Sequence, residues 1–175
     1  MKRNENILRT VALSALLTAM SVVIGFLCKT WFTFGAVRVT FENLPILLAG
    51  FAFGPFFGAA VGAASDVVSA VASGFAVNPL ITVGAAAVGL TAGITRRYLF
   101  KGNGYPSILC ASLIPHAVGS MLIKSVALYY MYGSLAMVLP RIPLYVCIAA
   151  AESYIIFILY KNRRIASALG GERTK

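Results

Sequence analysis

One apolar segment of the sequence carries polar side chains at a spacing that suits a binding site. Within residues 106–131 they recur at every fourth position, as Ser112, His116, Ser120 and Lys124. Residues four apart lie on the same face of an α-helix, so the spacing predicts one polar stripe. The stripe offers hydrogen-bond donors, acceptors and a positive charge, which together suit an anionic ligand. Taken alone, His116 is more typical of a hydrogen-bonded packing residue.

Two other apolar segments contain carboxylic acids. Asp66 lies deep within residues 55–75, and Glu152 lies deep in a later segment, on the same helix face as Arg141 and Tyr145. An ionisable group at such a position is costly unless it is paired or hydrated, so each acid is a candidate site residue.

A third polar group lies between apolar runs, in the stretch AVRVTFENLP of residues 36–45. It contains Arg38, Glu42 and Asn43, and the aromatic residues around it are Trp31, Phe32, Phe34 and Phe41. Aromatic faces stack on flat rings, cationic side chains bind carboxylates, and a buried carboxylate accepts ring N–H groups. These residue types suit a flat heteroaromatic ligand with an anionic tail.

Two interpretations of the polar residues remain open. In the first they converge on one cavity that opens outward, and the predicted ligand-binding residues are Trp31, Arg38, Asn43, Asp66, His116, Lys124, Arg141 and Glu152. In the second they form buried structural ion pairs, such as Asp66 with Lys124 or Glu152 with His116. A stand-alone proton-coupled carrier is a further alternative, because Asp66, Glu152 and His116 could relay protons.

Catalytic and cofactor signatures are missing from the sequence. Ser120 follows His116 by one helical turn, but no G-x-S-x-G, H-E-x-x-H or phosphate-binding G-x-x-x-x-G-K-[ST] motif accompanies them. The three cysteines are isolated and have no metal-ligand spacing. We therefore expect no enzymatic activity, no metal and no cofactor.

The composition predicts an integral membrane protein. Of the 175 residues, 59% are hydrophobic and 11% are charged, whereas soluble domains carry about 25% charged residues. The net charge of +10 does not indicate nucleic-acid binding, because the basic residues lie in short hydrophilic breaks between apolar segments, as membrane topology requires.

The apolar segments predict an all-α bundle of six transmembrane helices that forms a single membrane domain over residues 1–175. The predicted helices are roughly 7–28, 43–53, 55–75, 79–97, 106–131 and 141–160. A helix needs about 20 residues to span the membrane, so the second is short. No small-residue cleavage site follows the first, which we expect to be retained. Most basic residues lie on the side of the two termini, so the positive-inside rule places both termini in the cytoplasm.

Stripes of small residues predict close helix packing in the membrane. The third and fourth predicted helices carry Gly54, Gly58, Gly62, Ala85, Gly89 and Gly93, which we interpret as an intramolecular interface. The first has two such stripes, formed by Ala12, Ala15 and Ala19 and by Ser14, Thr18, Ser21 and Gly25. For the first helix two interpretations stay open: its small residues pack within the bundle, or part of this surface docks on another membrane protein.

The stretches VRVTFENLPILLAGFAFGPFFGAAVGAASDVVSA, VNPLITVGAAAVGLTAGI and YYMYG before LPRIP resemble the folate-type substrate-binding (S) component of energy-coupling factor (ECF) transporters. The resemblance covers roughly residues 8–160. It implies a six-helix bundle in the cell membrane that binds a vitamin from outside. It further implies assembly with a membrane-embedded coupling subunit and two cytoplasmic ATPases, and tilting of the bundle to release the vitamin.

The resemblance also implies roles for individual residues. Ala12, Ala15 and Ala19 would contact the coupling subunit. The outer loop would act as a lid in which Arg38 meets an acidic ligand, and Asp66 would pair with the amino and N–H edge of a pterin. Lys124 and Arg141 would lie near the ligand's glutamate carboxylates. Another heteroaromatic vitamin or precursor remains an alternative ligand.

Overall fold

The computed structural model describes residues 2–31, 33–34, 37–102, 104–133 and 138–162. In chain order, the elements are α1 (Lys2–Trp31), β1 (Thr33–Phe34), β2 (Val37–Arg38), α2 (Asn43–Phe53), α3 (Pro55–Ala72), α4 (Pro79–Ile94), the π-helical segment η1 (Thr95–Leu99), α5 (Tyr105–Pro115), the π-helical segment η2 (His116–Ile123), α6 (Lys124–Tyr132) and α7 (Arg141–Lys161). Apart from the two-residue antiparallel pair β1–β2, these elements are helical.

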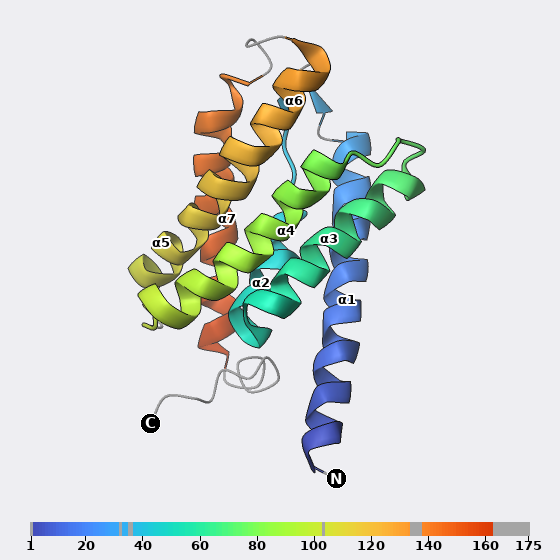
Figure 1. Ribbon diagram of the computed structural model, residues 1–175. Coiled ribbons are helices and arrows are strands. Elements are labelled where there is room, and N and C mark those ends of the chain that lie inside the picture. Colours follow the sequence, from blue (N-terminus) through green and yellow to red (C-terminus); the bar gives the residue numbers. More distant parts are fainter. Residues whose placement is uncertain (1, 32, 35–36, 103, 134–137, 163–175) are drawn as a thin grey trace.

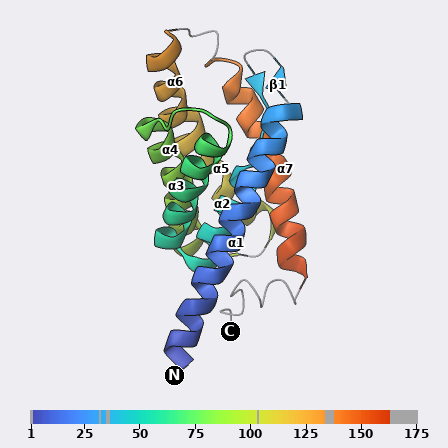
Figure 2. The ribbon, with the colours of Figure 1, turned by 90° about the vertical axis from the view of Figure 1, so that its right-hand side faces the viewer.

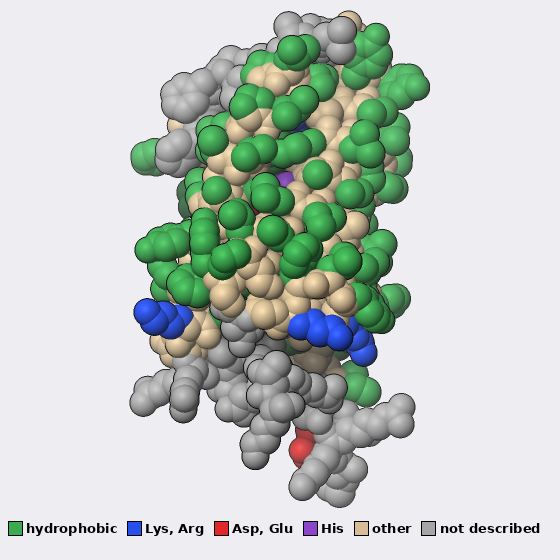
Figure 3. All heavy atoms as spheres, turned by 90° about the vertical axis from the view of Figure 1, so that its left-hand side faces the viewer, with side chains coloured by type: hydrophobic (Ala, Val, Ile, Leu, Met, Phe, Trp, Pro, Cys, Tyr) green, Lys and Arg blue, Asp and Glu red, His purple; other side chains and the backbone are tan. Residues whose placement is uncertain are grey.

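Five helical segments of the described chain are long and apolar enough to cross a membrane. They are Ile7–Cys28, Pro55–Ala72, Pro79–Leu99, Tyr105–Met131 and Arg141–Lys161. Helix α2 is shorter, so the expected six crossings stay a prediction. The side of the membrane on which the termini lie does not follow from these segments, so the cytoplasmic termini stay a prediction as well. Helix α1 begins and α7 ends at the same end of the bundle (Figures 1 and 2). Figure 3 shows one apolar face of the molecule, with Lys and Arg side chains in a band near that end.

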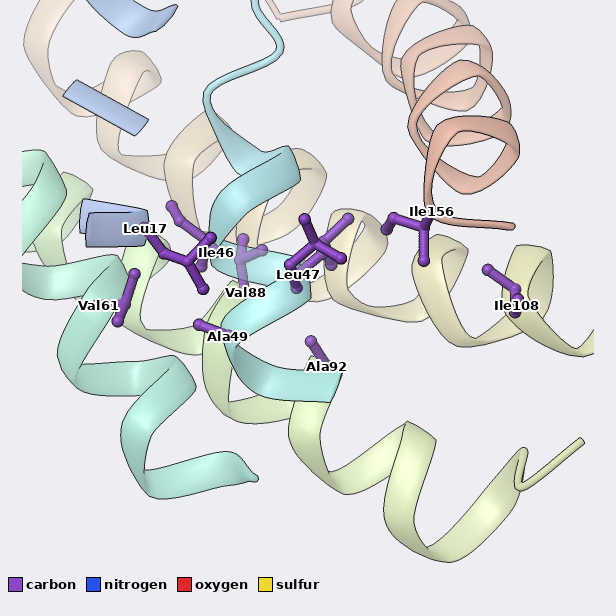
Figure 4. Packing of buried hydrophobic residues seen from close by; sticks show 10 residues of the cluster. Leu17, Ile46, Leu47, Ala49, Val61, Val88, Ala92, Ile108 and Ile156 are labelled. Carbon is purple, nitrogen blue, oxygen red and sulfur yellow. The ribbon is translucent and has the colours of Figure 1, made fainter. Parts of the chain in front are cut away.

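Helix α2 lies at the centre of the bundle. Its residues Ile46, Leu47, Leu48, Ala49 and Gly50 are all buried, and Figure 4 shows its side chains among those of α1, α3, α4, α5 and α7. A helix that is apolar on every face is buried in a protein core or in lipid, and α2 is buried among its neighbouring helices. Gly54, whose φ of 93° suits glycine, ends α2, and Pro55 begins α3.

Small residues form the interface between α3 and α4. A Cβ atom on Gly58 would collide with the carbonyl oxygen of Gly89, and one on Gly62 with that of Ala85. The two backbones are therefore in direct contact, as we expected from the small-residue stripes. Gly50 of α2 also faces the Gly89 carbonyl, at 2.7 Å from an added Cβ, so this contact includes the central helix.

The segment from α5 to α6 is one long helix with a π-helical middle. Pro115 has no backbone N–H, so the Ala111 carbonyl receives no helical hydrogen bond from it. Thr95 Oγ1 donates to that carbonyl instead, at 3.1 Å. At the other end of η2, the backbone N–H of Lys124 donates to Gly119, five residues earlier. The wider turns of η2 carry His116 and Ser120, and such segments are frequent at functional sites.

Candidate ligand-binding site

A cluster of buried polar side chains begins with His116 of η2 and Glu152 of α7. Both are fully buried, and His116 Nε2 lies 2.8 Å from Glu152 Oε2. The structure therefore brings together one of the two pairs considered from the sequence. An isolated buried carboxylate is very costly, and the histidine hydrogen bond reduces that cost.

Lys124 forms a different pair from the one considered. Its Nζ lies 3.6 Å from Glu42 Oε1, with side-chain exposures of 5% for Lys124 and 15% for Glu42. Asp66 instead accepts a hydrogen bond of 2.7 Å from Thr82 Oγ1. The suggested pair of Asp66 with Lys124 is therefore wrong, because each residue has another partner.

Asn43 and Tyr145 extend the cluster. The buried Asn43 begins α2, and its Nδ2 donates to Ser120 Oγ at 3.4 Å. The Tyr145 ring lies 5.9 Å from the His116 ring. Arg141 lies over the Tyr145 ring. Its guanidinium carbon is 5.3 Å from the ring centroid, and its Nη2 donates to the Tyr145 hydroxyl at 3.2 Å.

Several buried polar atoms of this cluster have no hydrogen-bond partner among the described residues. They are Asn43 Oδ1, His116 Nδ1, Arg141 Nε and Glu152 Oε1. Leaving a buried donor or acceptor unsatisfied costs about 1–3 kcal/mol, and native proteins contain few such groups. The backbone N–H of Leu44 also lies close to the Glu152 carboxylate. Because the four atoms lie together on α2, η2 and α7, they are available for binding a ligand.

The other predicted ligand residues lie elsewhere. Trp31 ends α1 and is 74% exposed. Arg38 pairs with Thr33 in the strand pair, and its side chain lies outside the described residues. Asp66 and Thr82 lie on the α3–α4 interface, one turn beyond the contact of Gly62.

Three residues of the cluster are not among the eight predicted ligand residues, although Ser120 and Glu42 belong to polar groups already noted in the sequence. Ser120 and Tyr145 share helix faces with predicted residues, so the spacing alone was a sufficient signal. Glu42 precedes Asn43, and nothing in the sequence shows that Lys124 is its partner. Among the described residues, no group of three His, Cys, Asp or Glu side chains is placed to hold a metal ion.

The two small-residue stripes of α1 face opposite environments. Ser14, Ser21 and Gly25 are buried, and Ser21 Oγ donates to the Glu42 carbonyl at 2.6 Å. The three residues of the alanine stripe, Ala12, Ala15 and Ala19, are exposed. One stripe therefore packs within the bundle, and the other lies on its surface.

Two comparisons with known proteins agree with this architecture. The family model described as "ECF transporter, substrate-specific component" matches residues 9–169. The solved structure described as "Crystal structure of FolT bound with folic acid" has a TM-score of 0.69 and 22% sequence identity, and covers 89% of this chain and 93% of that chain. At this identity, the likeness shows a shared fold. Among curated proteins, none matches the chain.

Proposed function

Because the chain belongs to the family of substrate-specific components of ECF transporters, we propose that it captures folate or a related pterin from outside the cell. As a member of that family it is a transporter component and not an enzyme. The shared fold with FolT, which was solved with folic acid, supports a pterin as the ligand class.

The observation that carries this proposal is the set of unsatisfied atoms in the buried cluster. A pterin ring has N–H groups, ring nitrogens and a carbonyl along its edge. Glu152 Oε1 and Asn43 Oδ1 can accept hydrogen bonds from the N–H groups, and Tyr145 offers an aromatic face. These groups match a flat heteroaromatic molecule better than an aliphatic one.

Cationic side chains next to the cluster would bind the ligand's anionic part. Lys124 is almost fully buried, and Arg141 has an unsatisfied Nε. Charge-assisted hydrogen bonds from such groups to carboxylates are short and strong. In the proposal the two residues contact the glutamate carboxylates of folate. Trp31 at the end of α1 and Arg38 of β2 also contact the ligand in the proposal. Asp66, whose carboxylate bonds Thr82 outside the cluster, is the alternative contact of the pterin edge.

Membership of the family implies that the protein works with an ECF module. We propose that this module consists of one membrane-embedded coupling subunit and two cytoplasmic ATPases, in the cytoplasmic membrane of a prokaryotic cell. The exposed stripe of Ala12, Ala15 and Ala19 supports the proposed docking face, since small residues let helices approach closely in lipid.

Calorimetric titration of the purified protein with folate tests the ligand assignment. We expect submicromolar binding, with quenching of Trp31, the only tryptophan. Riboflavin, a heteroaromatic vitamin without a pterin ring, is the matched control and should not bind. Binding of riboflavin without binding of folate would overturn the pterin assignment and favour another vitamin. Mass spectrometry of the molecule that copurifies with the protein gives an independent answer.

A further inference from the structure

The ion pair of Glu42 and Lys124 joins two parts of the chain that are distant in sequence. Glu42 lies between the strand pair β1–β2 and the start of α2, and Lys124 lies at the junction of η2 and α6. The ammonium group is nearly buried and the carboxylate is mostly buried. Among the described residues, Glu42 is the one acidic side chain within ion-pair distance of Lys124.

The backbone of Glu42 is held by two hydrogen bonds. Its N–H donates to Thr40 Oγ1 at 3.2 Å, and its carbonyl accepts from Ser21 Oγ at 2.6 Å. A carboxylate at this position could stabilise the N-terminus of α2. Among the described residues, however, the Glu42 side chain makes no capping hydrogen bond to α2 and is paired with Lys124.

Two glycines on separate helices make room for the pair. A Cβ atom on Gly25 of α1 would lie 2.9 Å from Glu42 Oε2, and one on Gly84 of α4 would lie 2.7 Å from Lys124 Cγ. Any larger residue at either position would displace one partner. The space around both side chains is therefore part of the architecture of the site.

The pair leaves Lys124 incompletely satisfied. An ammonium group has three donors, and charge-assisted N–H···O hydrogen bonds measure about 2.7–2.9 Å. The distance of 3.6 Å to Glu42 is longer than that. A buried charge needs both pairing and hydrogen bonds to offset its desolvation, so a better placed carboxylate would compete with Glu42.

We propose that Glu42 is a specificity-determining residue that occupies Lys124 until the carboxylate of an arriving ligand replaces it. This inference rests on the proposed function, since it assigns the ligand's anionic group to Lys124. A ligand without a carboxylate cannot replace Glu42, and a ligand carboxylate beside an unmoved Glu42 would be repelled. Competition with Glu42 thus lowers the affinity of ligands that place a carboxylate on Lys124 and leaves the affinity of ligands without one unchanged.

The test compares the wild-type protein with Glu42→Gln, using folate and the carboxylate-free 6-methylpterin as ligands. A ligand's apparent affinity falls in proportion to the fraction of binding-competent protein. If the ion pair occupies Lys124 in roughly nine of ten molecules, Glu42→Gln should bind folate about tenfold more tightly. Its affinity for 6-methylpterin should not change. Glu5→Gln, an equal change of charge at an exposed position of α1, is the matched control and should alter neither affinity.

Unchanged or weaker folate binding by a folded Glu42→Gln variant would overturn the assignment of Glu42. If that variant does not fold, Glu42→Asp replaces it, because the shorter side chain draws the carboxylate away from Lys124 and should also tighten folate binding. Wild-type protein that binds neither ligand would contradict the proposed function itself, and the ligand-dependent role of Glu42 with it.

Discussion

Replacing Glu152 with glutamine should weaken folate binding much more than it destabilises the fold. Glu152 Oε2 lies 2.8 Å from His116 Nε2, and Oε1 has no partner among the described residues. Glutamine has nearly the same shape and keeps a carbonyl oxygen, but it removes the negative charge that a ligand N–H would meet. A hydrogen bond to a charged group contributes about 1.5–3 kcal/mol. Since about 1.4 kcal/mol is a factor of ten, the folate Kd should rise roughly 10- to 150-fold.

Calorimetric titration gives the Kd of the Glu152→Gln variant, and thermal unfolding without ligand gives its Tm. If the pair with His116 served the architecture alone, the substitution would lower the free energy of unfolding and leave the folate Kd unchanged. A large fall in Tm with unchanged folate affinity would therefore refute the assignment of Glu152 to the ligand.

Asp66→Asn is the informative comparison for the Glu152 variant. Asp66 bonds Thr82 on the α3–α4 interface, outside the buried cluster. A greater loss of folate affinity in Asp66→Asn than in Glu152→Gln would place the N–H edge of the pterin on that interface.

Two further variants test the space around the site and the proposed docking face. Gly84→Ala places a methyl group 2.7 Å from Lys124 Cγ and should raise the folate Kd roughly tenfold through loss of one charge-assisted contact. In the control Gly104→Ala the nearest atom to the new methyl group is 3.7 Å away, and the folate Kd should stay unchanged. Equal Kd values of the two variants by calorimetry would contradict the placement of Lys124. The double variant Ala15→Leu and Ala19→Leu should keep folate binding but lose copurification with the ECF module, because bulky side chains prevent close helix contact. Copurification of this variant with the module would refute the proposal that the alanine stripe is the docking face.

The sequence predicts the helical membrane architecture well because length, apolar composition and breaks are local properties. Gly54 and Pro55 mark the end of α2 and the start of α3, as the sequence indicated. The central position of α2 was not predicted. An eleven-residue apolar helix can be tilted, partly spanning or fully enclosed, and only the packing of the neighbouring helices distinguishes these arrangements.

The candidate site was predicted in part. Helical spacing brought His116 and Glu152 into consideration, and the structure places them in contact. The partner of Lys124 could not be predicted, because a charge pair between distant segments depends on how the chain folds. The π-helical segment was missed for a similar reason: Pro115 is visible in the sequence, but the donation from Thr95 that satisfies the Ala111 carbonyl is a tertiary contact.

The most direct test of the buried cluster as the ligand site is nitrogen NMR of the histidine. His116 is the only histidine, so protein labelled with ¹⁵N-histidine and purified without a polyhistidine tag gives the signals of one imidazole ring. Its Nδ1 is buried without a partner among the described residues, and we predict that the Nδ1 signal shifts when folate saturates the protein. Saturation by folate with both imidazole nitrogen signals unchanged would show that the ligand binds elsewhere.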